Sequence, residues 1–102
     1  GAAALIVLPV DLPAVRPTDL EEIARLGLRH GMVICPDRHG AGTNALYVSS
    51  AFAPDFRFGA DSFRLHQEEA RRCGAAPKLL FNANIAMDVD LPADLAVFED
   101  AV

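Results

Sequence analysis

The segment ALIVLPVDLP, residues 4–13, is typical of a buried strand that presents one carboxylate, Asp11, near its carboxyl end. Its nearly uninterrupted apolar run suits a parallel strand covered on both faces, and Pro13 prevents the ladder of backbone hydrogen bonds from continuing. Open α/β sheets bind ligands outside the carboxyl ends of their strands, so Asp11 is a candidate site residue. The alternative is that Asp11 caps a turn before Pro13.

Length and composition predict a single globular domain spanning residues 1–102, and the order of the expected elements makes it an α/β domain. The chain is 52% hydrophobic and has a formal net charge of −5, which disfavours both disorder and a nucleic-acid partner. Lys78 is its single lysine. An acidic chain that handles anionic phosphates needs backbone N–H groups or metal ions to offset charge repulsion. The composition therefore points toward a divalent cation.

The cysteine and hydropathy patterns predict a cytoplasmic protein. Cys35 and Cys73 lack the spacing of a zinc site and are interpreted as reduced thiols. No apolar run approaches the roughly 18 residues of a membrane span, so no membrane partner is expected. No basic segment with a cleavage site opens the chain, and Gly1 to Ala3 are interpreted as a cloning remnant.

The order of elements predicts an α/β fold whose sheet is part of a larger one, with an edge that needs a partner. Thr18 and Glu21 are expected to form a capping box, and Ser62 and Gly74 to start and stop the second long helix. Apolar periodicity and turn residues predict, after the first strand, a helix from about residue 19, strands over 32–35 and 43–48, a helix over 62–73, a strand over 78–81 and a short helix after 92.

Three aspartates form the candidate metal site. Asp88 and Asp90 are two residues apart, so in an extended segment both carboxylates point to the same side. Together with Asp11 they offer the oxygen ligands that Mg²⁺ or Mn²⁺ prefers, and such ions usually bind substrate phosphates as well. The alternative is that the pair only complements the positive end of the helix that Pro92 opens.

Two glycine-containing segments are candidates for binding an anion. Gly42 precedes Thr43 and Asn44, so backbone N–H, hydroxyl and amide groups can approach an anionic oxygen there. Gly59 precedes Ser62, which lies at an expected helix start, and helix N-termini bind phosphates. The alternatives are an ordinary hairpin-type turn for the first segment and a helix cap for the second. No Walker A loop is present, since no lysine follows the glycines.

The histidines have no serine or cysteine partner that indicates nucleophilic catalysis. His30 is expected on the surface. His39 and His66 could line a pocket, but a structural role is the preferred interpretation for each. Arg38, beside the glycine loop, is the arginine with the clearest functional potential.

The chain resembles the 2-phospho-L-lactate guanylyltransferase family, which includes the enzymes that use phosphoenolpyruvate. The resemblance runs from about residue 5 to residue 95, and its motifs are PDR-x-G-x-GTNAL over residues 36–46, RFG-x-x-SF-x-x-H over 57–66 and DVD-x-P-x-DL over 88–95. It implies guanylyl transfer from GTP in biosynthesis of the deazaflavin coenzyme F-420. It also implies a three-layer fold like that of the nucleotide-diphospho-sugar transferases (GT-A, Rossmann-like), with a mixed, mostly parallel sheet.

The resemblance also implies residue roles. Asp11, Asp88 and Asp90 would hold Mg²⁺, while Thr43, Gly59 and Ser62 would bind the phosphorylated three-carbon acid. The family's nucleotide-receiving AK-x-RL-type motif has no counterpart before Leu5. The chain is therefore predicted to be the C-terminal half of the enzyme, inactive alone and completed by a first half or by a homo-oligomer partner.

The sequence is compatible with two other functions. One is a related nucleotidyltransferase that acts on a sugar phosphate or a pterin cofactor. The other is a truncated, non-catalytic protein that binds phosphate or pairs through its unfinished sheet, which the missing nucleotide motif favours.

Overall fold

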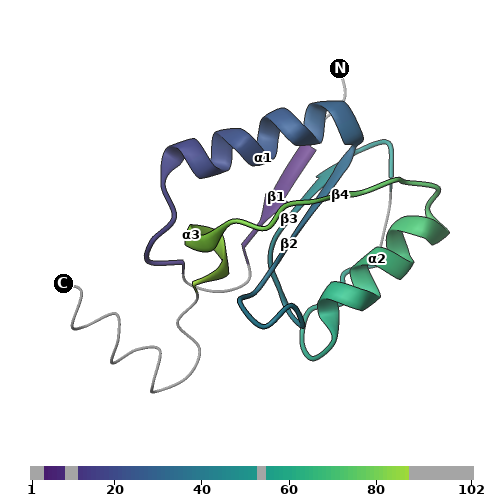
Figure 1. Cartoon of the computed structure of the whole chain (residues 1–102). Helices are drawn as coiled ribbons and strands as arrows, with labels where there is room; N and C mark the ends of the chain where they lie inside the picture. Colours follow the sequence, from purple (N-terminus) through teal and green to yellow (C-terminus); the bar gives the residue numbers. More distant parts are fainter. Residues whose placement is uncertain (1–3, 9–11, 53–54, 88–102) are drawn as a thin grey trace.

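The computed structural model describes residues 4–8, 12–52 and 55–87, which form four strands and three helices (Figure 1). The predicted final helix after residue 92 lies outside the described residues. In chain order the elements are β1 (Ala4–Val7), α1 (Pro17–His30), β2 (Met32–Pro36), β3 (Thr43–Ser49), α2 (Ser62–Arg72), β4 (Lys78–Leu79) and α3 (Ala83–Ala86).

The described strands form one mixed sheet in the order β1-β3-β2-β4. β3 is antiparallel to both β1 and β2, and β4 is parallel to β2. Two of these three pairings are antiparallel, so the expectation of a mostly parallel sheet is wrong for hydrogen-bonded neighbours. The reason is local, because the short connection over residues 37–42 folds β2 and β3 into a hairpin.

Helices cover both faces of this sheet, which gives three layers (Figure 1). On one face Ile23 and Leu26 of α1 pack against Val33 and Tyr47. On the other face Ala70 of α2 lies in a separate cluster with neighbouring strand residues. The alternation follows the pleat, since successive side chains of a strand point to opposite faces. β2 is buried throughout, as its uninterrupted apolar run predicts.

β1 corrects the prediction of a strand covered on both faces. It lies at an edge of the described sheet, and its first two residues are exposed. The side chain of Leu5 is 54% exposed. An apolar run shows that a strand is suited to burial, but it does not show that other residues of the same chain pack on both of its faces. That one sheet edge needs a partner stays a prediction.

α1 begins earlier than expected and uses a different capping box. Arg16 is the N-cap, and Asp19 accepts a hydrogen bond from the Arg16 backbone N–H at 2.8 Å. Thr18 and Glu21, the expected pair, are both exposed. Pro17 is the reason for the shift, because its fixed φ and missing N–H suit the first helical position. Gly31 ends the helix with φ 81°.

α2 and the segment after it differ from the prediction by small shifts. Asp61, with φ 60°, occupies the N-cap position of α2, so Ser62 is the first helical residue rather than the cap. Gly74 follows the helix with φ 80°, as a C-terminal stop should. The strand predicted over 78–81 is shortened to β4, and Phe81 is exposed. α3 was not predicted.

The cysteines and the hydropathy of the helices can be compared with the sequence predictions. Both cysteines are free, and burial, ahead of the nearby Glu22, raises the pKa of the Cys35 thiol to about 12. Within the described residues, no helix is long and apolar enough to cross a membrane.

Candidate functional site

The candidate site lies at one end of the sheet, where several chain segments converge (Figure 1). β1, β2 and β4 run in the same direction, so their carboxyl ends meet at this end. The loop over residues 37–42 leaves β2 here, and β3 begins here at Thr43. The loop also contacts the start of α2, because the Phe63 N–H donates to the Ala41 carbonyl at 2.9 Å. This is the position at which α/β sheets bind ligands.

The loop over residues 37–42 is a turn closed by its own aspartate. The N–H groups of His39 and Ala41 donate to Asp37 Oδ1, each at 3.0 Å, and the Gly40 N–H donates to the Asp37 carbonyl at 3.1 Å. These three donors are therefore used within the loop, and the connection is the hairpin-type turn considered as the alternative to an anion cradle. A Cβ on Gly42 would lie 2.9 Å from Asp37 Oδ2, so a side chain has no room there.

Thr43 and Ser62, predicted from segments 19 residues apart, are brought into direct contact. The Ser62 hydroxyl donates to Thr43 Oγ1 at 3.1 Å, and Thr43 Oγ1 lies 2.8 Å from His66 Nδ1. All three side chains are buried. A hydrogen-bonded chain of three side chains thus joins the start of β3 to the first two turns of α2. It orients both hydroxyls at the site end of the sheet.

His66 is part of this series of hydrogen bonds, although the sequence favoured a structural role for it. Its Nε2 accepts the Arg57 backbone N–H at 3.0 Å, and the ring packs edge-on against Phe58 at 4.8 Å between centroids. Burial lowers the pKa of His66, opposed by a hydrogen bond to the backbone of Ser62 and by the charge of Glu69. The available signal was its spacing, since it follows Ser62 by one helical turn.

The segment that supplies the Arg57 N–H is tied to α2 by a charged pair. Glu69 Oε1 accepts the Asp55 backbone N–H at 3.2 Å, and Glu69 Oε2 accepts Arg72 Nε at 2.6 Å. The Arg72 guanidinium is the largest cause of the lowered pKa of Glu69. These contacts fix the backbone of residues 55–57 beside His66.

Asn44, predicted to bind the acceptor, has another role among the described residues. Its amide nitrogen donates to the carbonyls of Ile85 at 3.0 Å and Ala86 at 3.3 Å. Asn44 is 3% exposed. Its side chain therefore holds the end of α3 against β3, two residues before the predicted metal ligand Asp88.

A second polar network fixes the start of α3. Asp19 accepts hydrogen bonds from the side-chain amides of Asn82 at 3.0 Å and Asn84 at 3.1 Å. The Asn82 side chain in turn caps α3 by accepting the N–H groups of Asn84 and Ile85. The Arg16 backbone N–H, ahead of the Asn82 amide, lowers the pKa of Asp19. α1 and α3 are thus joined through one carboxylate.

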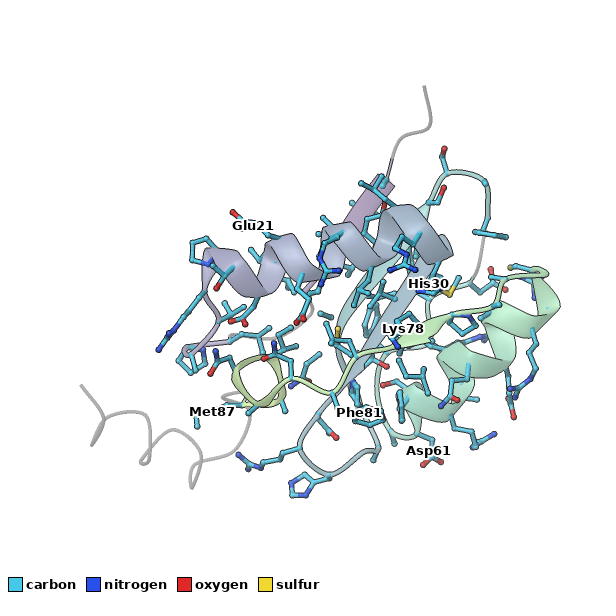
Figure 2. All side chains as sticks on the ribbon, turned by 45° about the horizontal axis from the view of Figure 1, so that its top comes forward. Glu21, His30, Asp61, Lys78, Phe81 and Met87 are labelled. Carbon is cyan, nitrogen blue, oxygen red and sulfur yellow. The ribbon has the colours of Figure 1, made fainter. Side chains whose placement is uncertain are left out.

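An open pocket of about 230 Å³ lies between residues 36–38 and the segment that contains α3. Phe81 precedes α3 and Met87 follows it, and both are exposed at this end of the molecule (Figure 2). The lining residues are Pro36, Asp37, Arg38, Phe81, Asn82, Ala83 and Ala86. Arg38 thus lies at a concave part of the candidate site, as its position beside the glycine loop suggested.

The remaining predicted site residues divide into two groups. Gly59 is exposed with φ 119°, a conformation that favours glycine, and its carbonyl accepts the Ser62 N–H at 3.2 Å. Asp11, Asp88 and Asp90 lie outside the described residues. Among the residues that are described, no group of three acidic, histidine or cysteine side chains could hold a metal ion.

Acidification below about pH 6.5 is expected to lower the free energy of unfolding. The folded-state pKa of His66 is depressed, so its contribution to stability is full above the unfolded pKa and is lost as the pH falls toward the folded pKa. Asp19 and Glu69 add a second loss below about pH 4. Urea unfolding as a function of pH measures both steps. His66→Asn should flatten the first step alone, and an unchanged profile would contradict this assignment.

Comparison with known proteins places the chain in a family. Residues 1–98 match the family described as "Guanylyl transferase CofC like". The chain belongs to this family. It is 40% identical over 100 residues to the phosphoenolpyruvate guanylyltransferase of Rubrobacter xylanophilus, an alignment covering 97% of the chain and 49% of the relative. The family resemblance inferred from the three motifs is thereby confirmed.

Two further relatives show the breadth of the family. The phosphoenolpyruvate guanylyltransferase of Sphaerobacter thermophilus is 36% identical, covering 93% of the chain and 46% of the relative. The 2-phospho-L-lactate guanylyltransferase of Methanocaldococcus jannaschii is 31% identical, covering 89% of the chain and 40% of the relative. The chain therefore spans about half the length of the curated relatives it matches, or somewhat less.

Proposed function

We propose that this chain supplies the acceptor-binding and metal-binding part of a guanylyltransferase that transfers GMP from GTP to phosphoenolpyruvate or 2-phospho-L-lactate, in biosynthesis of coenzyme F-420. Family membership across residues 1–98 is the observation that carries the proposal, since relatives bear both substrate names. A nucleotide-binding part completes the active unit. This part lies outside residues 1–102, since the chain covers 49%, 46% and 40% of the length of the three relatives.

The acceptor part of the proposal is supported by the contact between Thr43 and Ser62. Two hydroxyl oxygens 3.1 Å apart lie at the start of α2, beside the positive end of its helix dipole, and one of the two hydroxyls can donate a hydrogen bond to a ligand. Gly59 presents its backbone at the same turn, without a side chain in the way. A phosphorylated three-carbon acid is small enough to be held by such a group. Discrimination between the two acids belongs to residues around it.

The metal part of the proposal assigns Mg²⁺ or Mn²⁺ to Asp11, Asp88 and Asp90. It is supported by the described elements that lead to these residues, because β1 ends at the same sheet end where Asn44 holds Ile85 and Ala86. Carboxylate oxygens suit a hard divalent cation. When bound, the cation neutralises phosphate charge on GTP and on the acceptor.

In the proposed reaction the residues of this chain position the acceptor rather than react with it. Thr43 and Ser62 hold the acceptor phosphate so that one of its oxygens faces the α-phosphorus of GTP. That oxygen forms a bond to the α-phosphorus as the bond to pyrophosphate breaks, and pyrophosphate leaves. Such positioning replaces a bimolecular encounter by a prearranged one, and no covalent intermediate on the enzyme is needed.

Asp88→Asn is expected to lower the affinity for phosphoenolpyruvate in the presence of Mg²⁺ by about tenfold or more, and to leave the metal-free affinity unchanged. Isothermal titration calorimetry with and without Mg²⁺ measures both affinities. Glu21→Gln is the matched control, because it removes one exposed carboxylate on α1, away from the site (Figure 2). If Asp88→Asn keeps the full effect of Mg²⁺, Asp88 is only a capping residue.

A further inference from the structure

A continuous hydrogen-bonded chain runs from a backbone N–H to the predicted acceptor-binding hydroxyls. The Arg57 N–H meets His66 Nε2 at 3.0 Å, His66 Nδ1 meets Thr43 Oγ1 at 2.8 Å, and Ser62 Oγ meets Thr43 Oγ1 at 3.1 Å. His66 is 1% exposed and Ser62 is 1% exposed, so bulk water does not compete for these contacts. The direction of each hydrogen bond is therefore set by the protein itself.

The backbone donor fixes the tautomer of His66. A backbone N–H can only donate, so Nε2 must present its lone pair to Arg57 and carries no proton. The neutral imidazole then has its proton on Nδ1, which donates to Thr43 Oγ1. The opposite tautomer would place two N–H donors against each other at 3.0 Å. Burial, which lowers the pKa of His66, favours the neutral ring as well.

The number of available protons determines whether the hydroxyl pair can donate a hydrogen bond to a ligand. With Nδ1–H donating to Thr43, one hydroxyl proton forms the contact between Thr43 and Ser62, whichever residue provides it. The other hydroxyl proton is used in neither of these two contacts. With the opposite tautomer, Thr43 would donate to Nδ1 and Ser62 to Thr43, and no proton would remain. The tautomer thus decides whether the pair can donate to a ligand.

We propose that His66 is a positioning residue that turns the hydroxyl pair of Thr43 and Ser62 into a donor of one hydrogen bond, and so selects a ligand group that can only accept one. The chemistry that fits is an ionised oxygen of a phosphate or carboxylate. This inference rests on the proposed function, because it deepens the acceptor role of the same two residues. It adds His66, which does not touch the acceptor, and the Arg57 backbone N–H, which sets the tautomer of His66.

The tautomer itself is open to direct measurement on the wild-type protein. Nitrogen-15 chemical shifts of the His66 ring distinguish a proton on Nδ1 from a proton on Nε2. We expect the neutral ring with Nδ1 protonated at pH 7. A ring protonated on Nε2 would overturn the inference without any variant being made.

Two substitutions of His66 separate its two contacts. In His66→Asn the short side-chain amide reaches the position of Nδ1 and can still donate to Thr43, whereas the longer amide in His66→Gln reaches the position of Nε2 and accepts from Arg57 instead. We expect His66→Gln to weaken phosphoenolpyruvate binding by about tenfold or more, the loss typical of a hydrogen bond to a charged group. His66→Asn should retain most of the affinity. Equal affinities for both variants would overturn the inference.

Thr43→Val distinguishes failure of this inference from failure of the proposed function. If Thr43→Val weakens phosphoenolpyruvate binding and His66→Gln does not, the hydroxyls bind the acceptor without help from His66, and the inference alone is wrong. If Thr43→Val has no effect on binding, the acceptor site itself is misplaced and the ligand preference falls with it. Urea unfolding of each variant shows that the comparison is made between folded proteins.

Discussion

Gly27→Ala is expected to lower the free energy of unfolding by about 1 to 3 kcal/mol, the range for overpacking a well-packed core. A Cβ at residue 27 would overlap the ring of Tyr47, because this ring of β3 lies directly against α1 at Gly27. Tyr47 is 5% exposed and has little space into which to move. The loss should exceed the gain of up to about 1 kcal/mol that alanine brings to a helix interior. Chemical denaturation measures the difference.

Leu28→Ala is the matched control for this substitution. Leu28 is the next residue of α1 and is 83% exposed, so its truncation should change the free energy of unfolding very little. A truncation of Tyr47 combined with Gly27→Ala should cost less than the sum of the two single changes, since the clash is then relieved. A Gly27→Ala protein as stable as the wild type would show that α1 does not approach β3 as described.

Thr43→Val is expected to weaken phosphoenolpyruvate or phospholactate binding by about tenfold to a hundredfold. A hydrogen bond to a charged group contributes roughly 1.5 to 3 kcal/mol, and each 1.4 kcal/mol corresponds to about a factor of ten. Ser62→Ala removes the neighbouring hydroxyl and should act in the same direction. Calorimetric titration of the purified protein with each acid measures the effect.

The same substitutions also test a purely structural role. Thr43→Val leaves the His66 Nδ1–H and the Ser62 hydroxyl without their shared acceptor, so some loss of folding stability is expected in either case. Thr43→Ser keeps the hydroxyl and should bind the acids almost as the wild type does. Reduced stability with unchanged affinity in both Thr43→Val and Ser62→Ala would mean that the two hydroxyls only hold β3 to α2.

The sequence allowed the central strands and both long helices to be predicted, because each is set by local pattern. β2 is a short apolar run that follows Gly31 and ends at Pro36, and α2 is followed by Gly74 in the left-handed conformation. The starts of both long helices differ from the prediction, because a neighbouring residue occupies the expected cap position. Asp61 took the position expected for Ser62, and Asp19 replaced the expected box of Thr18 and Glu21.

The parts that could not be predicted depend on residues far apart in the chain. α3 is four residues long and depends on the Asn82 cap and on a carboxylate of α1, 63 residues away from Asn82. No local pattern signals such a contact. The acceptor role proposed for Thr43 and Ser62 correctly implied that the two lie together, but the connection to His66 required the fold. The metal role of the three aspartates stays a prediction.

β1 forms an exposed edge of the described sheet, and the chain covers 40% to 49% of the length of the three relatives. Leu5 and Leu8 are exposed there, and β1 pairs only with β3 among the described strands. An unpaired edge with apolar side chains favours pairing with a further strand. We expect a further strand to pair at this edge.

Pyrophosphate release from GTP in the presence of Mg²⁺ and phosphoenolpyruvate or 2-phospho-L-lactate tests the central claim most directly. The 102-residue chain alone should release none, because we propose that the nucleotide-binding part lies outside it. Addition of the remaining half of the enzyme, in the same polypeptide or in trans, should give release that depends on both GTP and the acceptor acid. Robust turnover by the purified chain alone would contradict the proposed division of roles. Failure of the completed enzyme to respond to either acid would contradict the proposed function.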